Sequence, residues 1–295
     1  ISSLLISSIC QQHISWERIV SYTNIPDREI KLAISSSPIR TIFKGQDQWH
    51  MFTSSLVAEH ILRTTTMSSD VLLDTYHSII RRTLYDSEDR RSGQDAYQNS
   101  KELMKFRLVS RIFDHSASKG AYIESLYERL SGVPRARMNP QFWLQYGMAK
   151  LEFNETSAAL RFIETAESLA RQRGLDYDDY QIVDQKARIL LKLASAETGS
   201  AEVAQRHIVD ACEILSGSLN STTLPIYPMR SIPFLLDALE PHCESMAPES
   251  RAAVKRLISK YDDVDDGAVK KKSMKGEVAM LRGKLRECKI IIANS

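Results

Sequence analysis

One spacing of small residues occurs twice in this chain, and it constrains the fold more than any other feature. The pattern is a small residue, an apolar residue four positions later and a small residue seven positions later: Ala159, Ile163 and Ala166, then Ala204, Ile208 and Ala211. Small residues at helical spacing let two helices approach closely, so the pattern predicts stacked helical hairpins. The open alternative is that any packed helical hairpin needs small residues where its helices cross.

A tryptophan precedes the first copy at a characteristic distance. Tyr146 and Gly147 lie three and four positions after Trp143, and Ala159 lies sixteen positions after it. This spacing is that of tetratricopeptide repeats, in which two helices form each unit. The copies are 45 residues apart, more than the about 34 residues of a strict unit. We therefore predict a degenerate, tetratricopeptide-like α-solenoid.

The rest of the chain also has mostly helical periodicity. Gly and Pro together number only 20 of 295 residues, and they punctuate the apolar stripes. The last segment has apolar residues at alternating spacings of four and three: Met274, Val278, Leu281, Leu285, Cys288 and Ile292. We expect this segment to form a helix that packs on the preceding pair and caps the array. The predicted fold class is mainly α.

The N-terminal part is the exception to the helical pattern. Two short helical patterns, at 15–22 and 27–34, precede β-branched and aromatic runs at 39–43 and 49–52. Residues 44–48 between these runs include the Gly and Asp that favour a hairpin turn. Two helices followed by a hairpin are the order of a small winged-helix domain.

These patterns predict four parts of the chain. They are a winged-helix-like domain with following helices (1–85), an exposed linker (86–100), the helical repeats (101–262) and a capping C-terminal helix (263–295). The linker is predicted because its sequence has mixed charge and no apolar stripe.

Composition and motifs argue against several function classes. The net charge is only +2, which does not favour binding to nucleic acid or to a membrane surface. The four cysteines have no metal-ligand spacing, and there is no phosphate-loop, GxGxxG, HExxH or GxSxG motif. We therefore predict no catalytic, cofactor-binding or metal-binding residue. We expect a cytoplasmic protein, and an apolar opening at Ile1 that continues a chain from upstream.

Partner binding is instead expected on the helical repeats. Solenoids bind through non-core residues of the first helix in each pair. The candidate partner-binding residues lie on or near these helices: Gln145, Lys150, Asp184, Gln185 and Arg188.

Two segments carry a family resemblance. The stretch 139–147 (NPQFWLQYG) resembles the start of the helical-repeat region in a group of bacterial STAND NTPases, NLR-like defence proteins. The segment 52–62 resembles the end of their winged helix, where Val57, Ala58 and Glu59 match an HRLIAE-like run. Ser54 and Ser55 stand where His-Arg is common in that family.

The resemblance implies a sensor and autoinhibitory region of an antiviral ATPase. Its repeats would bind a protein partner, which the resemblance implies is a phage protein, and release homo-oligomerisation. It also implies an upstream nucleotide-binding domain that binds ATP and Mg²⁺, preceded by an effector domain, so that no enzyme lies within this chain.

Two other readings remain open. One is a transcriptional regulator whose winged helix reads DNA and whose repeats bind a partner. Residues 27–37 would form its recognition helix, but Arg28 and Lys31 are balanced there by Asp27 and Glu29, whereas DNA readers need several cationic phosphate contacts. Arg40 and Lys44 would add cations in the wing. The other is a plain protein-interaction scaffold.

Overall fold

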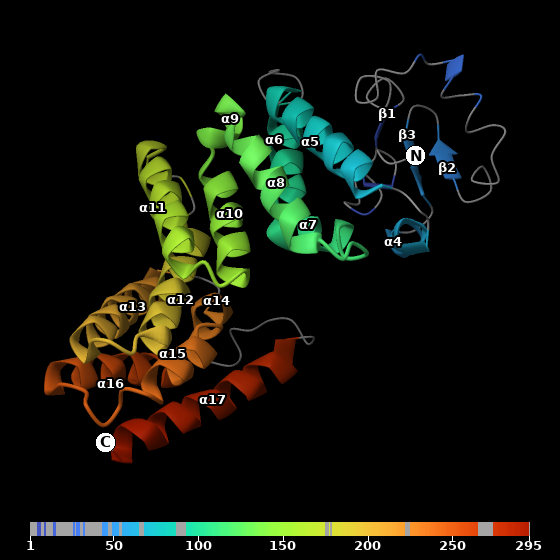
Figure 1. The fold of residues 1–295 in the computed structure, drawn as a ribbon. Coiled ribbons are helices and arrows are strands. Elements are labelled where there is room, and N and C mark those ends of the chain that lie inside the picture. Colours follow the sequence, from blue (N-terminus) through green and yellow to red (C-terminus); the bar gives the residue numbers. More distant parts are fainter. Residues whose placement is uncertain are drawn as a thin grey trace. The chain divides into compact units, whose positions relative to one another are not determined.

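The fold was obtained as a computed structural model of the whole chain. It describes residues 5–6, 9, 14–15, 26, 28–29, 32, 43–46, 49–52, 55–64, 68–86, 93–174, 177, 179–221, 225–264 and 274–294. The chain divides into two compact units, 1–149 and 150–295, and each is described by itself. Helices predominate in both units (Figure 1), which confirms the mainly α class.

Leu5, Ile6 and Ile9 of the first unit are helical and buried, and a small antiparallel sheet follows them. The strands are β1 (Ile14–Ser15), β2 (Phe43–Gln46) and β3 (Trp49–Phe52), in the order β1-β3-β2. Gln46 pairs with Trp49, so the predicted hairpin is present. Strand β3 has the predicted bounds, 49–52. Strand β2 was predicted at 39–43, but it begins at residue 43 and ends at residue 46. Strand β1 was not predicted, because two residues carry no periodicity.

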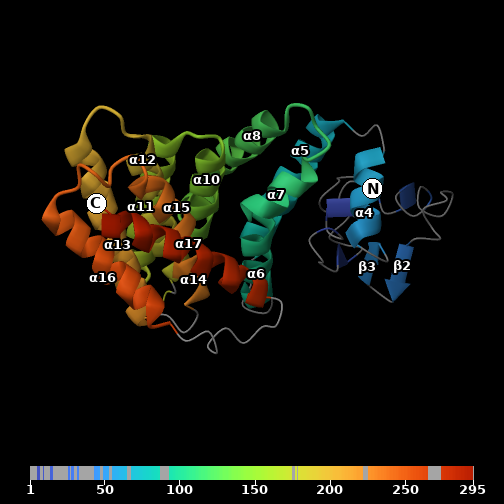
Figure 2. The same cartoon turned by 90° about the horizontal axis from the view of Figure 1, so that it is seen from below.

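The two helices predicted before the hairpin lie mostly outside the described residues. Arg28, Glu29 and Leu32 are helical. After the hairpin, α4 (Ser55–Thr64) packs on β3 and buries Ala58 and Leu62 (Figure 2).

A group of helices completes the first unit. They are α5 (Ser69–Asp86), α6 (Gly93–Leu103), α7 (Phe106–Ile112), α8 (Lys119–Ser131), α9 (Pro134–Arg137) and α10 (Pro140–Glu152), whose last residues enter the second unit. Two buried tyrosines tie these helices together. The Tyr76 hydroxyl donates to the Leu103 carbonyl at 2.6 Å, and the Tyr127 hydroxyl donates to the Met104 carbonyl at 2.8 Å. The end of α6 is thereby held by α5 and α8.

Two predicted boundaries are wrong in this region. Residues 93–100 belong to α6 and not to an exposed linker, and Ser100 is fully buried. The predicted linker lacks an apolar stripe, but tertiary contacts with α5 order its second half. The division between the compact units falls after Ala149, inside the region predicted as repeats, and not at 86–100.

The second unit consists of stacked helices. After the end of α10 come α11 (Thr156–Gln172), α12 (Tyr180–Ala196), α13 (Ala201–Ser221), α14 (Ile226–Met229), α15 (Ile232–Leu239), α16 (Pro248–Asp262) and α17 (Lys275–Asn294). Helix α12 packs against α11, α13 and α15, while α13 packs against α16. Helix α17 packs on α15 and α16 (Figures 1 and 2).

Small residues lie at the helix contacts of the second unit. Ala187 and Ala194 of α12 are fully buried in one apolar core with Ala204 and Ala211 of α13. Five residues of the predicted C-terminal seam are buried in the same core: Val278, Leu281, Leu285, Cys288 and Ile292. The expected packing of the last helix on the preceding helices is thus present. The tetratricopeptide identity of the repeats stays a prediction.

Candidate functional site

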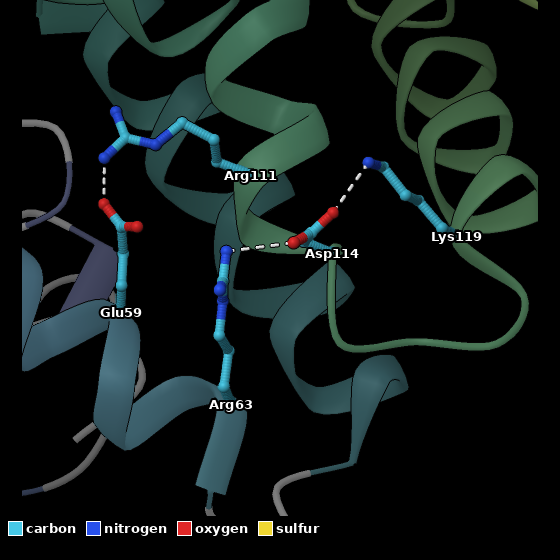
Figure 3. A network of polar contacts seen from close by, with 5 residues as sticks. All are labelled: Glu59, Arg63, Arg111, Asp114 and Lys119. Atoms are coloured by element: carbon cyan, nitrogen blue, oxygen red, sulfur yellow. Dashed lines mark hydrogen bonds and ion pairs between the residues drawn. The ribbon is translucent and has the colours of Figure 1, made fainter.

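The most developed polar feature of the first unit joins α4 to the turn between α7 and α8. Five charged side chains form this α4 network: Glu59, Arg63, Arg111, Asp114 and Lys119 (Figure 3). Arg111 pairs with Glu59. Arg63 Nη2 lies 2.9 Å from Asp114 Oδ2, and Lys119 Nζ lies 3.0 Å from Asp114 Oδ1.

Sequence spacing explains why these residues meet. Glu59 and Arg63 are four apart on α4, so they share one helix face. Arg111 is in the last turn of α7, and Asp114 follows the end of that helix. The two segments therefore present an acid and a base each, and opposite charges face one another in both pairs. This arrangement matches the charges of α4 to those at the α7–α8 turn.

The network holds its partners weakly enough to be released. The side chains of Arg63, Asp114 and Arg111 are about half exposed, whereas Glu59 retains 14% exposure. Exposed ion pairs contribute only about 0–1 kcal/mol each, and salt screens them. The hydrogen bond from Lys119 lowers the pKa of Asp114, and the charge of Arg63 adds to this effect. Asp114 therefore stays ionised between two cations over the neutral pH range.

Gln145, the first predicted partner-binding residue, has an internal role. It lies in α10 with 5% exposure, and its Oε1 accepts a hydrogen bond from the backbone N–H of Phe106 at 2.9 Å. Phe106 is the first residue of α7. The N–H groups in the first turn of a helix have no partner within that helix. Gln145 thus caps α7 from a position 39 residues away in the sequence.

The other four predicted residues lie in the second unit. Lys150 is 7% exposed, and its ammonium contacts both carboxylate oxygens of Glu155 at 2.9 Å. Gln185 is 6% exposed. Arg188 is partly buried and donates to the Tyr227 carbonyl at 2.8 Å and to Ser231 Oγ at 3.1 Å.

Asp184 has the most unusual environment of the set. It is 2% exposed, and its Oδ1 accepts a hydrogen bond from the Ser218 hydroxyl at 2.6 Å. Its Oδ2 is buried and has no partner among the described residues. Burial raises the pKa of Asp184, while the Ser218 hydrogen bond and the charge of Arg188 oppose that rise. Burial also lowers the pKa of Arg188.

The five predicted residues therefore do not form one exposed surface. Gln145 belongs to the first unit and the other four to the second. Gln145, Lys150, Asp184 and Gln185 are all buried, because tertiary partners that the local pattern does not reveal cover these polar side chains. Of the set, the structure brings Asp184, Gln185 and Arg188 together on α12. A role in partner binding stays a prediction for them.

In the part of the chain that the structure describes, no three His, Cys, Asp or Glu side chains gather as a metal site would require. Burial raises the pKa values of Cys212 and Cys288 to about 12, so neither thiol is a thiolate near neutral pH.

Sequence reasoning missed most of the α4 network. Glu59 was singled out through the family resemblance, whereas Arg63, Arg111, Asp114 and Lys119 were not singled out. The spacing of four between Glu59 and Arg63 was the available local signal. Asp114 lies 51 residues after Arg63 in the sequence, and Arg111 lies 52 residues after Glu59. A helix-face pattern does not reveal contacts between segments so far apart.

Comparisons with known proteins add no family to this geometry. No protein-family model matches the chain, and no curated protein is significantly similar to it. Among the described residues, no helix is both long and apolar enough to cross a membrane.

Proposed function

We propose that this chain is the non-catalytic sensor and autoinhibitory region of a bacterial STAND ATPase in antiphage defence. Its helical repeats bind a protein, and its winged-helix part controls homo-oligomerisation of the full-length cytoplasmic protein. ATP and Mg²⁺ belong to the nucleotide-binding domain that the resemblance implies, since the chain contains no phosphate-loop sequence.

The stacking order in the second unit carries this proposal. Helix α12 packs on α13 and on α15, and α13 in turn packs on α16. A succession of helices in which each packs on its neighbours is what an α-solenoid requires. Such arrays provide extended surfaces for protein partners, which favours a binding role.

The small sheet supports the winged-helix part of the proposal. A short strand precedes the helical region, and it pairs with the last strand to give the order β1-β3-β2. Winged-helix domains have this order. The described residues Arg28 and Glu29 have opposite charges and are exposed, so they add no net charge for DNA binding.

The α4 network suggests how control is exerted. Helix α4 follows the sheet directly, and its ion pairs tie it to the α7–α8 turn. Because these pairs are individually weak, a binding event that favours another position of α4 needs little energy to break them. We propose this network as the releasable contact of the autoinhibited state.

The experiment is a two-step binding assay with the purified chain. Immobilised chain is incubated with nuclease-treated lysates of phage-infected and uninfected bacteria, and retained proteins are identified by mass spectrometry. A phage protein retained only from infected cells is then purified and titrated against the chain by calorimetry. Binding near one-to-one stoichiometry supports the proposal. A parallel incubation uses lysates that were not treated with nuclease. If DNA is retained from these lysates and no phage protein is retained, the result contradicts the proposal and favours a transcriptional regulator.

A further inference from the structure

Helices α13 and α16 enclose a shallow groove between two polar bridges. At one end, Gln205 of α13 bonds to the Ser245 carbonyl and to the Ala247 N–H, both at 2.9 Å. At the other end, Lys260 of α16 bonds to the Ser216 carbonyl at 3.0 Å. The start of α16 therefore lies beside the start of α13, and the two helices run in the same direction.

The groove opens into a depression near the Lys260 bridge. Its volume is about 220 Å³, and it is lined by Cys212, Glu213, Ser216, Ala253, Arg256 and Lys260. Cys212 and Ala253 are 1% and 4% exposed. Two small side chains facing each other leave this space between the helices. Pockets for drug-sized ligands hold about 300–1,000 Å³, so this depression suits a single side chain.

The charges of the lining are unequal. Arg256 and Lys260 supply two cations, while Glu213 supplies one anion. Lys260 also contacts Asn220 Oδ1 at 3.1 Å, so its ammonium is held in place. Arg256 is exposed, and its guanidinium has no hydrogen-bond or ion-pair partner among the residues that the structure describes.

A guanidinium beside a depression that also contains the Cys212 thiol and the Ala253 methyl group is suited to one chemical class. Its planar fork donates two parallel hydrogen bonds to a carboxylate, and such charge-assisted bonds are stronger than neutral ones. The thiol of Cys212 and the methyl group of Ala253 do not form hydrogen bonds that would compete with those between Arg256 and a ligand. Lys260 adds a second, fixed positive charge to the same depression.

We propose that the α13–α16 groove binds an acidic side chain of a protein partner, with Arg256 as the forked donor. Lys260 supports the carboxylate electrostatically, and Glu213 limits affinity by repulsion. The inference rests on the proposed partner-binding function, for which it names a surface and a chemistry. Its test uses a synthetic peptide, so either proposal can fail alone.

The probe is a fluorescein-labelled octaglutamate peptide, titrated with the 295-residue chain and followed by fluorescence anisotropy at low ionic strength. Arg256→Gln should weaken binding about tenfold, the loss expected for one charge-assisted interaction. Glu213→Gln should strengthen binding, because the repelling carboxylate is removed.

Two exposed residues of α16 that do not line the groove provide matched controls. Lys255→Gln removes a cation as Arg256→Gln does, and Glu249→Gln removes an anion as Glu213→Gln does. Both should leave the dissociation constant unchanged within about twofold. Thermal melts followed by circular dichroism compare the folding of all four variants, and if Arg256→Gln were unfolded, the Glu213 and Glu249 pair would decide.

Four results would overturn the inference. Three come from the peptide titrations: absence of peptide binding, equal weakening by Arg256→Gln and Lys255→Gln, and equal strengthening by Glu213→Gln and Glu249→Gln. The fourth comes from competition with small anions. Two small anions are compared as competitors of the peptide: glutarate, which carries carboxylates, and inorganic phosphate, which does not. If phosphate displaced the peptide at the same concentration as glutarate, the groove would recognise negative charge and not an acidic side chain. If the groove variants lost peptide binding as expected but the lysate assay retained no phage protein, the inference about the groove would stand. Only the proposed antiphage function would then be removed.

Discussion

Replacing Ser218 by Ala tests the buried polar contact in the core of the second unit. The hydroxyl donates to Asp184 Oδ1 at 2.6 Å, and both residues are at most 6% exposed. Because Asp184 Oδ2 has no partner among the described residues, the variant leaves a buried carboxylate without either hydrogen bond. A hydrogen bond to a charged group contributes about 1.5–3 kcal/mol, so Ser218→Ala should destabilise the second unit by about that amount.

Urea denaturation followed by circular dichroism measures this loss, and thermal melts should show a fall in Tm of roughly 3–10 °C. The control is Ser221→Ala on the same helix, since Ser221 is exposed and its hydroxyl contacts only carbonyls of its own helix. That control should change stability by less than about 0.5 kcal/mol. Equal effects of the two variants would refute the assigned role of the Ser218 hydroxyl.

A double-mutant cycle identifies the partner of the hydroxyl. In the Asp184→Asn background the acceptor is neutral, so removing the hydroxyl should cost only about 1 kcal/mol. The same cost of Ser218→Ala in both backgrounds would show that the carboxylate charge has no part in the contact.

The pH dependence of stability follows from the direction of the shift at Asp184. Burial raises the pKa of this carboxyl in the folded chain, so the native state binds the proton more tightly than the unfolded state does. Stability should therefore fall as pH rises from the unfolded pKa of about 3.9 through the higher folded pKa. Urea midpoints across this window should show the fall in the unmodified chain and a smaller one in Asp184→Asn.

Three further substitutions test the remaining contacts. Asp114→Asn should destabilise the first unit by less than about 1 kcal/mol, and added salt should abolish the difference between its urea midpoint and that of the unmodified chain. Gln145→Leu should cost about 1–3 kcal/mol in urea denaturation, because the Phe106 N–H loses its acceptor; a neutral result would contradict the capping role. Arg230 Nε donates a hydrogen bond to Glu277 Oε1 at 2.7 Å, and this bond lowers the pKa of Glu277 in the folded chain. The stabilisation is present above the unfolded pKa and is lost as pH falls through the lower folded pKa. Arg230→Gln should therefore destabilise the second unit at neutral pH but little in acid.

Helices with a clear apolar period were predictable from the sequence. The buried residues of α12, α13, α16 and α17 recur at helical spacing, and the local pattern contains this information. Helix α6 was not predictable in the same way, because its sequence is polar and its order depends on packing against α5. Two-residue β1 likewise exists only through its pairing with β3.

The burial of the candidate partner-binding residues was not predictable for a related reason. Gln145 and Asp184 are polar, and a helix-face argument assigns polar residues to solvent. Each is instead buried against a partner more than 30 residues away, Phe106 for Gln145 and Ser218 for Asp184. A local pattern reports the type of each residue but not which distant segment covers it. The same limit applies to the ion pairs of α4.

The two kinds of polar contact in this chain have different consequences for function. Contacts of the Asp184 kind are buried, so breaking one leaves an uncompensated polar group and costs more than the contact itself contributes. In the α4 network, the pair of Arg63 with Asp114 is about half exposed, so water replaces a lost partner there at little cost. The second unit is therefore expected to keep one arrangement of its helices while it binds a partner. The junction of α4 with the α7–α8 turn is expected to exchange between joined and separated states, which is the property that a releasable contact needs.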